Sequence, residues 1–137
     1  MAYELREHTA DVAVAAEAAT LGGVFAAVAN GMAAAMAEDI PKTGGTRFDV
    51  SESAENREAL LFDYLDRLIY ERDVREVLPV DNEAVVTTTE TGFRVDASAR
   101  GVSFSEVVAR DLKAVTYSQM ELREAERGWY AYVVFDV

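Results

Sequence analysis

The sequence of 137 residues contains no cysteine and a single histidine, His8. Without thiols, the chain can form no disulfide bond, no thiolate metal site and no cysteine nucleophile. One histidine also excludes zinc sites that are built from several histidines. Any mechanism that needs a histidine must use His8, which we interpret as a structural residue.

Cations are scarce as well. Lysine and arginine number 13 against 25 aspartates and glutamates, so the formal net charge is −12, and the only lysines are Lys42 and Lys113. A protein that binds nucleic acid through its phosphates needs an excess of cations, so direct binding of nucleic acid is not expected. Half of the residues are apolar, which excludes a disordered acidic tail.

The chain also lacks a long hydrophobic run, an internal repeat and a low-complexity linker. Its most apolar stretch, residues 21–37, is interrupted by three glycines and an asparagine, a pattern that argues against a membrane span. We therefore expect a single domain over residues 1–137, without a signal peptide or a membrane partner, in the cytoplasm.

Hydrophobic periodicity predicts two amphipathic helices, at residues 20–37 and 56–72, with apolar residues every three or four positions. In the second helix, Arg72 and Glu71 are expected on the solvent side. Alternating segments predict strands at 3–7, 11–16, 47–51, 84–90, 93–99, 112–123 and 129–136. Residues 103–110 fit a loop or a poorly formed strand. These elements predict an α+β fold, an antiparallel β-sheet sandwich with the two helices packed on one face.

The end of the printed chain carries two carboxylates on neighbouring residues, the side chain of Asp136 and the terminus of Val137. A third carboxylate would complete a hard-cation site of the calcium or magnesium type. We expect Asp11, at the bend between the first two predicted strands, to supply it. The alternative is that Asp11 only caps a turn, a common use of aspartate.

The last predicted hairpin brings a lysine to the same place. If it turns at about residues 124–128, paired residue numbers sum to roughly 250 to 252. The allowed pairs are Asp136 with Ala114 or Thr116, and Val137 with Lys113 or Val115. Lys113 is therefore expected beside the carboxylates, either as a functional ammonium group or as a cation that only neutralises the terminus.

Three segments resemble the archease family, in the right order and over essentially the whole chain. They are His8–Val12, Leu60–Leu65 and Lys113–Tyr117, the last followed by a final strand that ends in Asp136 and Val137. The chain differs from the family pattern at Ala13, where a glycine is usual, and at Ser118, where a histidine is frequent.

The resemblance implies an α+β sandwich and a protein that assists the RNA ligase of tRNA splicing, without catalytic residues of its own. Such a protein promotes guanylylation of the ligase and repeated turnover. The resemblance also implies a metal site at Asp11, Asp136 and the terminal carboxylate of Val137, with Lys113 as a further functional residue. Calcium is the expected ion, with magnesium or manganese as alternatives.

Two other functions compete with this interpretation. The first is a general chaperone or modulator of RNA-processing proteins, which would bind many clients. The second is a phosphohydrolase that uses the acidic cluster with a divalent metal, although the sequence offers no good general base for it. Binding to one ligase, and the absence of phosphoester turnover by the purified protein, would separate these from a ligase activator.

The acidic, lysine-poor composition predicts a protein adapted to concentrated salt. Salt screens the repulsion between carboxylates, so its addition should stabilise a chain of net charge −12. We expect the melting temperature to rise steadily as KCl is increased to molar concentrations, as followed by circular dichroism. A melting temperature that does not respond to KCl would contradict the prediction.

Overall fold

The computed structural model describes residues 2–8, 11–103 and 110–137. Within this part of the chain, two helices and seven strands follow one another in an order that begins and ends with strands. They are β1 (Ala2–His8), β2 (Asp11–Ala18), α1 (Leu21–Met36), β3 (Thr46–Ala54), α2 (Arg57–Arg75), β4 (Val77–Thr89), β5 (Gly92–Ser103), β6 (Ala114–Ala125) and β7 (Gly128–Asp136). No described helix combines the length and the apolar character that crossing a membrane requires.

Both helices begin at polar capping residues. The hydroxyl of Thr20 accepts a hydrogen bond from the Gly23 N–H at 2.9 Å, and the side-chain carbonyl of Asn56 accepts one from the Ala59 N–H at 2.8 Å. These bonds satisfy amide groups that the first turn leaves without a partner. The caps explain why each helix starts within one residue of its predicted start.

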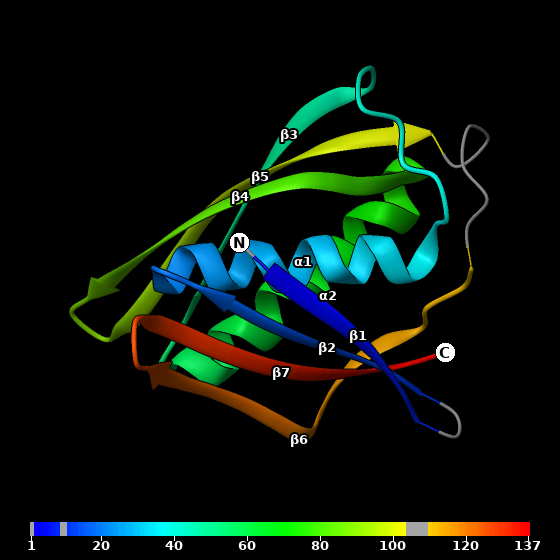
Figure 1. Cartoon of the computed structure of the whole chain (residues 1–137). Helices are drawn as coiled ribbons and strands as arrows, with labels where there is room; N and C mark the ends of the chain where they lie inside the picture. Colours follow the sequence, from blue (N-terminus) through cyan, green and yellow to red (C-terminus); the bar gives the residue numbers. More distant parts are fainter. Residues whose placement is uncertain (1, 9–10, 104–109) are drawn as a thin grey trace.

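The strands form two antiparallel sheets with the helices between them (Figure 1). The first sheet has the order β1-β2-β7-β6 and the second β3-β5-β4. Helix α1 contacts β4 of one sheet and β2 of the other, while α2 contacts β3 and β6. Each sheet thus has helices on its inner face, so the predicted α+β sandwich is confirmed.

The core lies where the two helices meet the inner faces of the sheets. The ring of Tyr64 on α2 is fully buried and packs against Phe25 on α1, with ring centroids 5.8 Å apart. Close approach is possible because α1 is rich in small residues: a Cβ added at Gly22 would lie 2.3 Å from the Ala84 carbonyl oxygen of β4. Burial raises the pKa of Tyr64, so its hydroxyl remains protonated.

Three expectations about the elements were incomplete or wrong. Strand β4 begins at Val77, seven residues before the predicted start, because a bulge at Asp81 interrupts the alternation that a sequence pattern requires. Helix α2 extends to Arg75, and its Glu71 and Arg72 are buried rather than on the solvent side. Of the undecided segment, Ser103 ends β5, and residues 104–109 lie outside the described residues.

The β6–β7 hairpin has an irregular register. Next to the turn, Ala125 pairs with Gly128, so the turn lies within the predicted region. Between Thr116 and Glu121, however, β6 advances five residues while β7 advances two. This bulge shifts the register so that Ala114 pairs with Asp136, which is one of the two predicted partners.

Candidate functional site

The two aspartates of the predicted site face each other across neighbouring strands. Asp11 is the first residue of β2, Asp136 is the last residue of β7, and the two are paired in the antiparallel ladder. Directly paired residues have side chains on the same face of a sheet, with Cβ atoms about 4.5–5.5 Å apart. Two carboxylates so placed repel each other, which favours a cation between them.

Lys113 enters the site through its backbone. Its N–H donates a hydrogen bond of 2.8 Å to the carbonyl oxygen of Asp136, and the next residue, Ala114, is paired with Asp136 across β6 and β7. Asp136 therefore has Asp11 on one side and the start of β6 on the other. The predicted proximity of Lys113 to the end of the chain is present in the structure.

A buried arginine holds the other side of the same peptide group. The Arg72 guanidinium, 7% exposed, donates a hydrogen bond of 2.7 Å to the carbonyl oxygen of Leu112. This carbonyl and the Lys113 N–H belong to one peptide bond, so its two polar groups link the end of α2 to the end of β7. Hydrogen bonds on both sides of the Leu112–Lys113 peptide group thus fix the backbone from which the Lys113 side chain extends.

Arg110, two residues before Leu112, is hydrogen-bonded to the end of α1. Its backbone N–H donates to the carbonyl oxygen of Met36, and its Nε donates to that of Ala35 at 3.2 Å. Both acceptors lie in the last turn of α1, where carbonyl groups have no partner within the helix. A guanidinium group at this end also compensates the negative pole of the helix dipole.

The chemistry of the donors fits a hard divalent cation. Among the described residues, the side chains of Asp11, Asp136 and Lys113 make no hydrogen bond or ion pair, and no three His, Asp or Glu side chains converge. A three-carboxylate site therefore needs a group besides these side chains, and the assignment of Val137 as the third ligand stays a prediction. Carboxylate oxygens are the ligands of calcium and magnesium.

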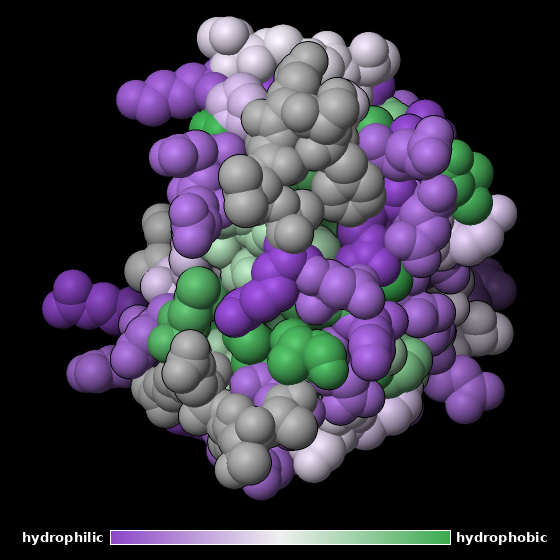
Figure 2. Space-filling view, turned by 90° about the vertical axis from the view of Figure 1, so that its right-hand side faces the viewer, coloured by the Kyte–Doolittle hydropathy of each residue, from purple (hydrophilic) through white to green (hydrophobic). Residues whose placement is uncertain are grey.

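The site lies on an open, polar end of the molecule. Figure 2 looks onto the end at which Figure 1 places the C-terminus. Among the side chains that Figure 2 colours by hydropathy, most are hydrophilic and a few hydrophobic ones lie between them. Asp136 and Lys113 are exposed, and Asp11 is half-buried. Such a surface suits contact with another macromolecule better than enclosure of a small substrate.

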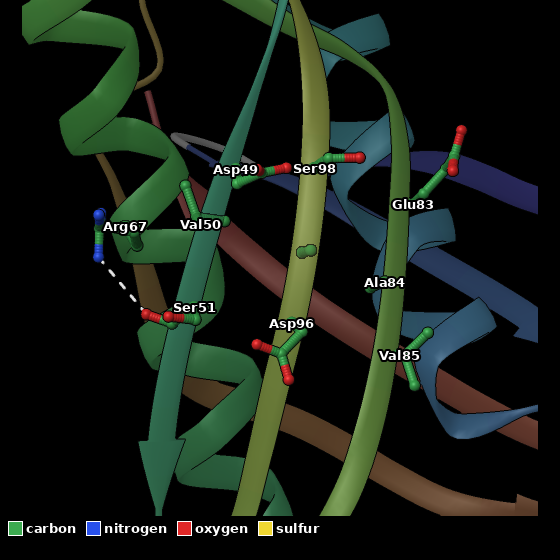
Figure 3. A pocket seen from close by; sticks show the side chains of 10 residues that line it. Asp49, Val50, Ser51, Arg67, Glu83, Ala84, Val85, Asp96 and Ser98 are labelled. Atoms are coloured by element: carbon green, nitrogen blue, oxygen red, sulfur yellow. Dashed lines mark hydrogen bonds between the residues drawn. The ribbon is translucent and has the colours of Figure 1, made fainter.

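A second candidate is a hollow of about 530 Å³ on the outer face of the β3-β5-β4 sheet. Asp49, Ser98 and Glu83 form one row across the three strands (Figure 3). Arg67 is the basic residue among the described residues that line the hollow, and it is already paired with Glu52 at 2.8 Å. These carboxylates lie on an open sheet face that water solvates, so we assign no site to them.

The sequence interpretation missed Arg72. A signal was present, because Tyr64, Leu68 and Arg72 are spaced four residues apart and so continue the inward-facing stripe of α2. Charge alone had assigned Arg72 to the solvent side. A charged residue on an apolar stripe indicates a buried charge with specific acceptors, here the Leu112 carbonyl.

Comparison with known proteins gives matches over almost the whole chain. The model of the Archease protein family matches residues 3–137. Protein archease from Methanosarcina mazei is 33% identical over 139 residues, which cover 98% of this chain and 95% of that protein. Protein archease from Thermococcus gammatolerans is 31% identical, with 98% of each chain covered.

Solved structures show the same fold. The solution structure of protein 1598 from Methanobacterium thermoautotrophicum has a TM-score of 0.86, with 25% identity and 98% of each chain covered. An archease from Thermotoga maritima, described as a possible chaperone, has a TM-score of 0.66 at 17% identity, covering 96% of this chain and 94% of that one.

We expect Arg72→Met to lower the free energy of unfolding by about 1–3 kcal/mol, the cost of leaving the buried Leu112 carbonyl without a donor. Amide hydrogen exchange at Lys113 should become faster in the same variant. The control is Arg94→Met, because Arg94 forms an exposed pair with Asp96 and should contribute less than about 1 kcal/mol. Equal losses in urea unfolding, with no change in Lys113 exchange, would contradict the assignment.

Proposed function

The chain belongs to the archease family, as its three sequence segments predicted, and we propose that it activates the RNA ligase of tRNA splicing. This enzyme joins a 3′-phosphate or 2′,3′-cyclic phosphate to a 5′-hydroxyl. An archease from Thermotoga maritima is described as a possible chaperone, and we propose for this chain an accessory role without catalytic residues of its own. In our proposal, the protein promotes guanylylation of the ligase and so allows repeated turnover.

The observation that carries the proposal is the pair Asp11 and Asp136 beside the backbone of Lys113. We propose that the two aspartates, with the carboxyl group of Val137, hold a divalent cation, calcium in the first instance. A bound cation would remove the repulsion between the carboxylates and offer a positive charge to phosphate oxygens. Lys113 would present its ammonium group at the edge of the same site.

Charge supports a ligase as the partner. An enzyme that binds a nucleotide and two RNA ends must surround phosphates with cations. The carboxylates of Asp11 and Asp136, at a polar end of the molecule, can pair with such cations at contact distance. Because hydrogen bonds hold the Lys113 backbone, the site loses little conformational freedom when it binds the ligase pocket.

A general chaperone is the second candidate, because the Thermotoga maritima relative is described as a possible chaperone. A chaperone binds many unfolded clients, whereas an activator binds one folded enzyme. Affinity capture from cells that express the ligase separates them: a single dominant ligase supports the activator, and a broad set of unfolded proteins supports the chaperone.

We expect Asp11→Ala, Asp136→Ala and Lys113→Ala each to reduce stimulation of ligase guanylylation by at least about tenfold, as is usual when a metal site is disturbed. Transfer of labelled GMP to the ligase is the measurement. The controls are Asp49→Ala and Lys42→Ala, which remove an exposed aspartate and the other lysine away from the site. Full stimulation by all three site variants would refute the proposal.

Metal binding has its own test in the isolated protein. Calcium should raise the melting temperature, because an ion that binds only the folded state stabilises it. Asp11→Asn should abolish this response and raise the melting temperature in EDTA, since removal of a directly opposed like charge gains about 0.2–1 kcal/mol. Asp49→Asn should leave the calcium response unchanged. A calcium response in Asp11→Asn equal to that of the unaltered chain would exclude Asp11 as a ligand.

A further inference from the structure

We infer that the outward side of α2, together with Tyr117 of β6, is a docking surface for a basic, arginine- or lysine-bearing surface of a partner protein. We call it the α2 face, and its residues are Phe62, Asp63, Asp66, Tyr70, Val74 and Tyr117. The inference extends the proposed function and rests on it only for the identity of the partner.

Three apolar or aromatic residues of the α2 face are unusually exposed. Tyr70 is 59% exposed, Val74 is 60% exposed and Tyr117 is 55% exposed. The ring of Tyr117 stacks on that of Phe62, with centroids 4.2 Å apart and an interplanar angle of 8°. Exposed tyrosines held in place by a neighbour are typical of the residues that dominate binding energy at protein interfaces.

Helix geometry places these residues together. At 3.6 residues per turn, the α2 members of the face fall within about 120° of the helix circumference. Tyr117 joins them because the bulge between Thr116 and Glu121 displaces β6 from its ladder with β7. The bulge therefore has a consequence beyond register, since it carries an aromatic ring onto the helix.

The charge on the α2 face is negative. Asp63 and Asp66 have no cationic partner among the described residues. The arginines of α2 are engaged elsewhere: Arg57 lies over Phe93 and Trp129, Arg67 pairs with Glu52, Arg72 donates to Leu112, and Arg75 pairs with Glu71. Burial, then Glu52 and Asp66, raise the pKa of Asp63, as expected for a partly buried carboxyl group beside other carboxylates.

The exposed rings and the negative charge together favour a basic protein as the partner that binds the α2 face. A second copy would bring the same carboxylates against themselves, and RNA would bring phosphates, so both are repelled. Arginine and lysine side chains can pair with Asp63 and Asp66 and also lie over the rings of Tyr70 and Tyr117. Tyr117 lies in β6, whose first residue, Ala114, follows Lys113, so the α2 face is linked through β6 to the Asp11–Asp136 site.

The test uses the whole protein and two synthetic helical peptides. One peptide presents leucine and arginine on one face, and the other has glutamate in place of arginine. We expect the arginine peptide to shift the amide NMR signals of the α2 face, and the glutamate peptide to shift none of them. The double variant Tyr70→Ser/Val74→Ser should bind the arginine peptide about tenfold more weakly, the loss typical of one or two interface hot spots.

The matched control is Val85→Ser on β4, because Val85 is 62% exposed but lies on the other sheet. It should bind the peptide like the unaltered chain, and unchanged melting temperatures will show that each variant folds. Equal binding by the double variant and the control would overturn the inference, as would equal shifts with the glutamate peptide.

A guanylylation assay with the ligase tests this inference separately from the proposed function. If both hold, Tyr70→Ser/Val74→Ser should raise the ligase concentration needed for half-maximal guanylylation about tenfold and leave the maximal stimulation unchanged. If the unaltered protein stimulates and the double variant behaves identically, the α2 face is not the docking surface. If the unaltered protein does not stimulate the ligase, the proposed function fails and the peptide titration still decides the inference.

Discussion

The hydrogen bond from Arg72 to the Leu112 carbonyl is the contact on which the candidate site depends. Residues 110–113, which precede β6, have no regular secondary structure, so the backbone before Lys113 is held by individual contacts, from Arg110 to the end of α1 and from Arg72 to Leu112. A buried arginine is costly to desolvate unless its donors are used. Here one donor binds a carbonyl, and Nε pairs with Asp73 at 2.9 Å. These two bonds offset the cost of burying the charge, and the bond to Leu112 also orders the backbone that leads to the site.

The order of the strands explains why the aspartates meet. Strands β2 and β7 are neighbours in the middle of the β1-β2-β7-β6 sheet, although they are far apart in the sequence. Their antiparallel pairing places the first residue of one beside the last residue of the other. A pair of like charges at this position weakens the sheet, and folds retain such local conflicts mainly where a site requires them. This conflict is the physical reason for our proposal that the carboxylate pair serves a function.

Parts of this arrangement were predictable from the sequence, and parts depended on tertiary contacts. Periodicity identified both helices, because their apolar stripes persist over several turns. Counting along the last hairpin predicted Ala114 or Thr116 opposite Asp136. Ala114 is the partner, and a bulge that the count did not include sets this register. The burial of Arg72 was not predicted, since its acceptor on Leu112 is 40 residues away. Long-range acceptors of this kind leave no local pattern in a sequence.

High salt would change how such an acidic protein recognises a partner. In molar salt, electrostatic attraction extends only about 3 Å, so a net charge of −12 steers a partner very little. Recognition must then rely on contacts at van der Waals distance and on charge pairs that exclude water. The α2 face combines both, because exposed rings at Tyr70 and Tyr117 lie beside the carboxylates of Asp63 and Asp66. Apolar contact is not weakened by salt. An acidic surface adapted to salt therefore needs exposed aromatic residues where it binds, and the diffuse remainder of its charge contributes little to specificity.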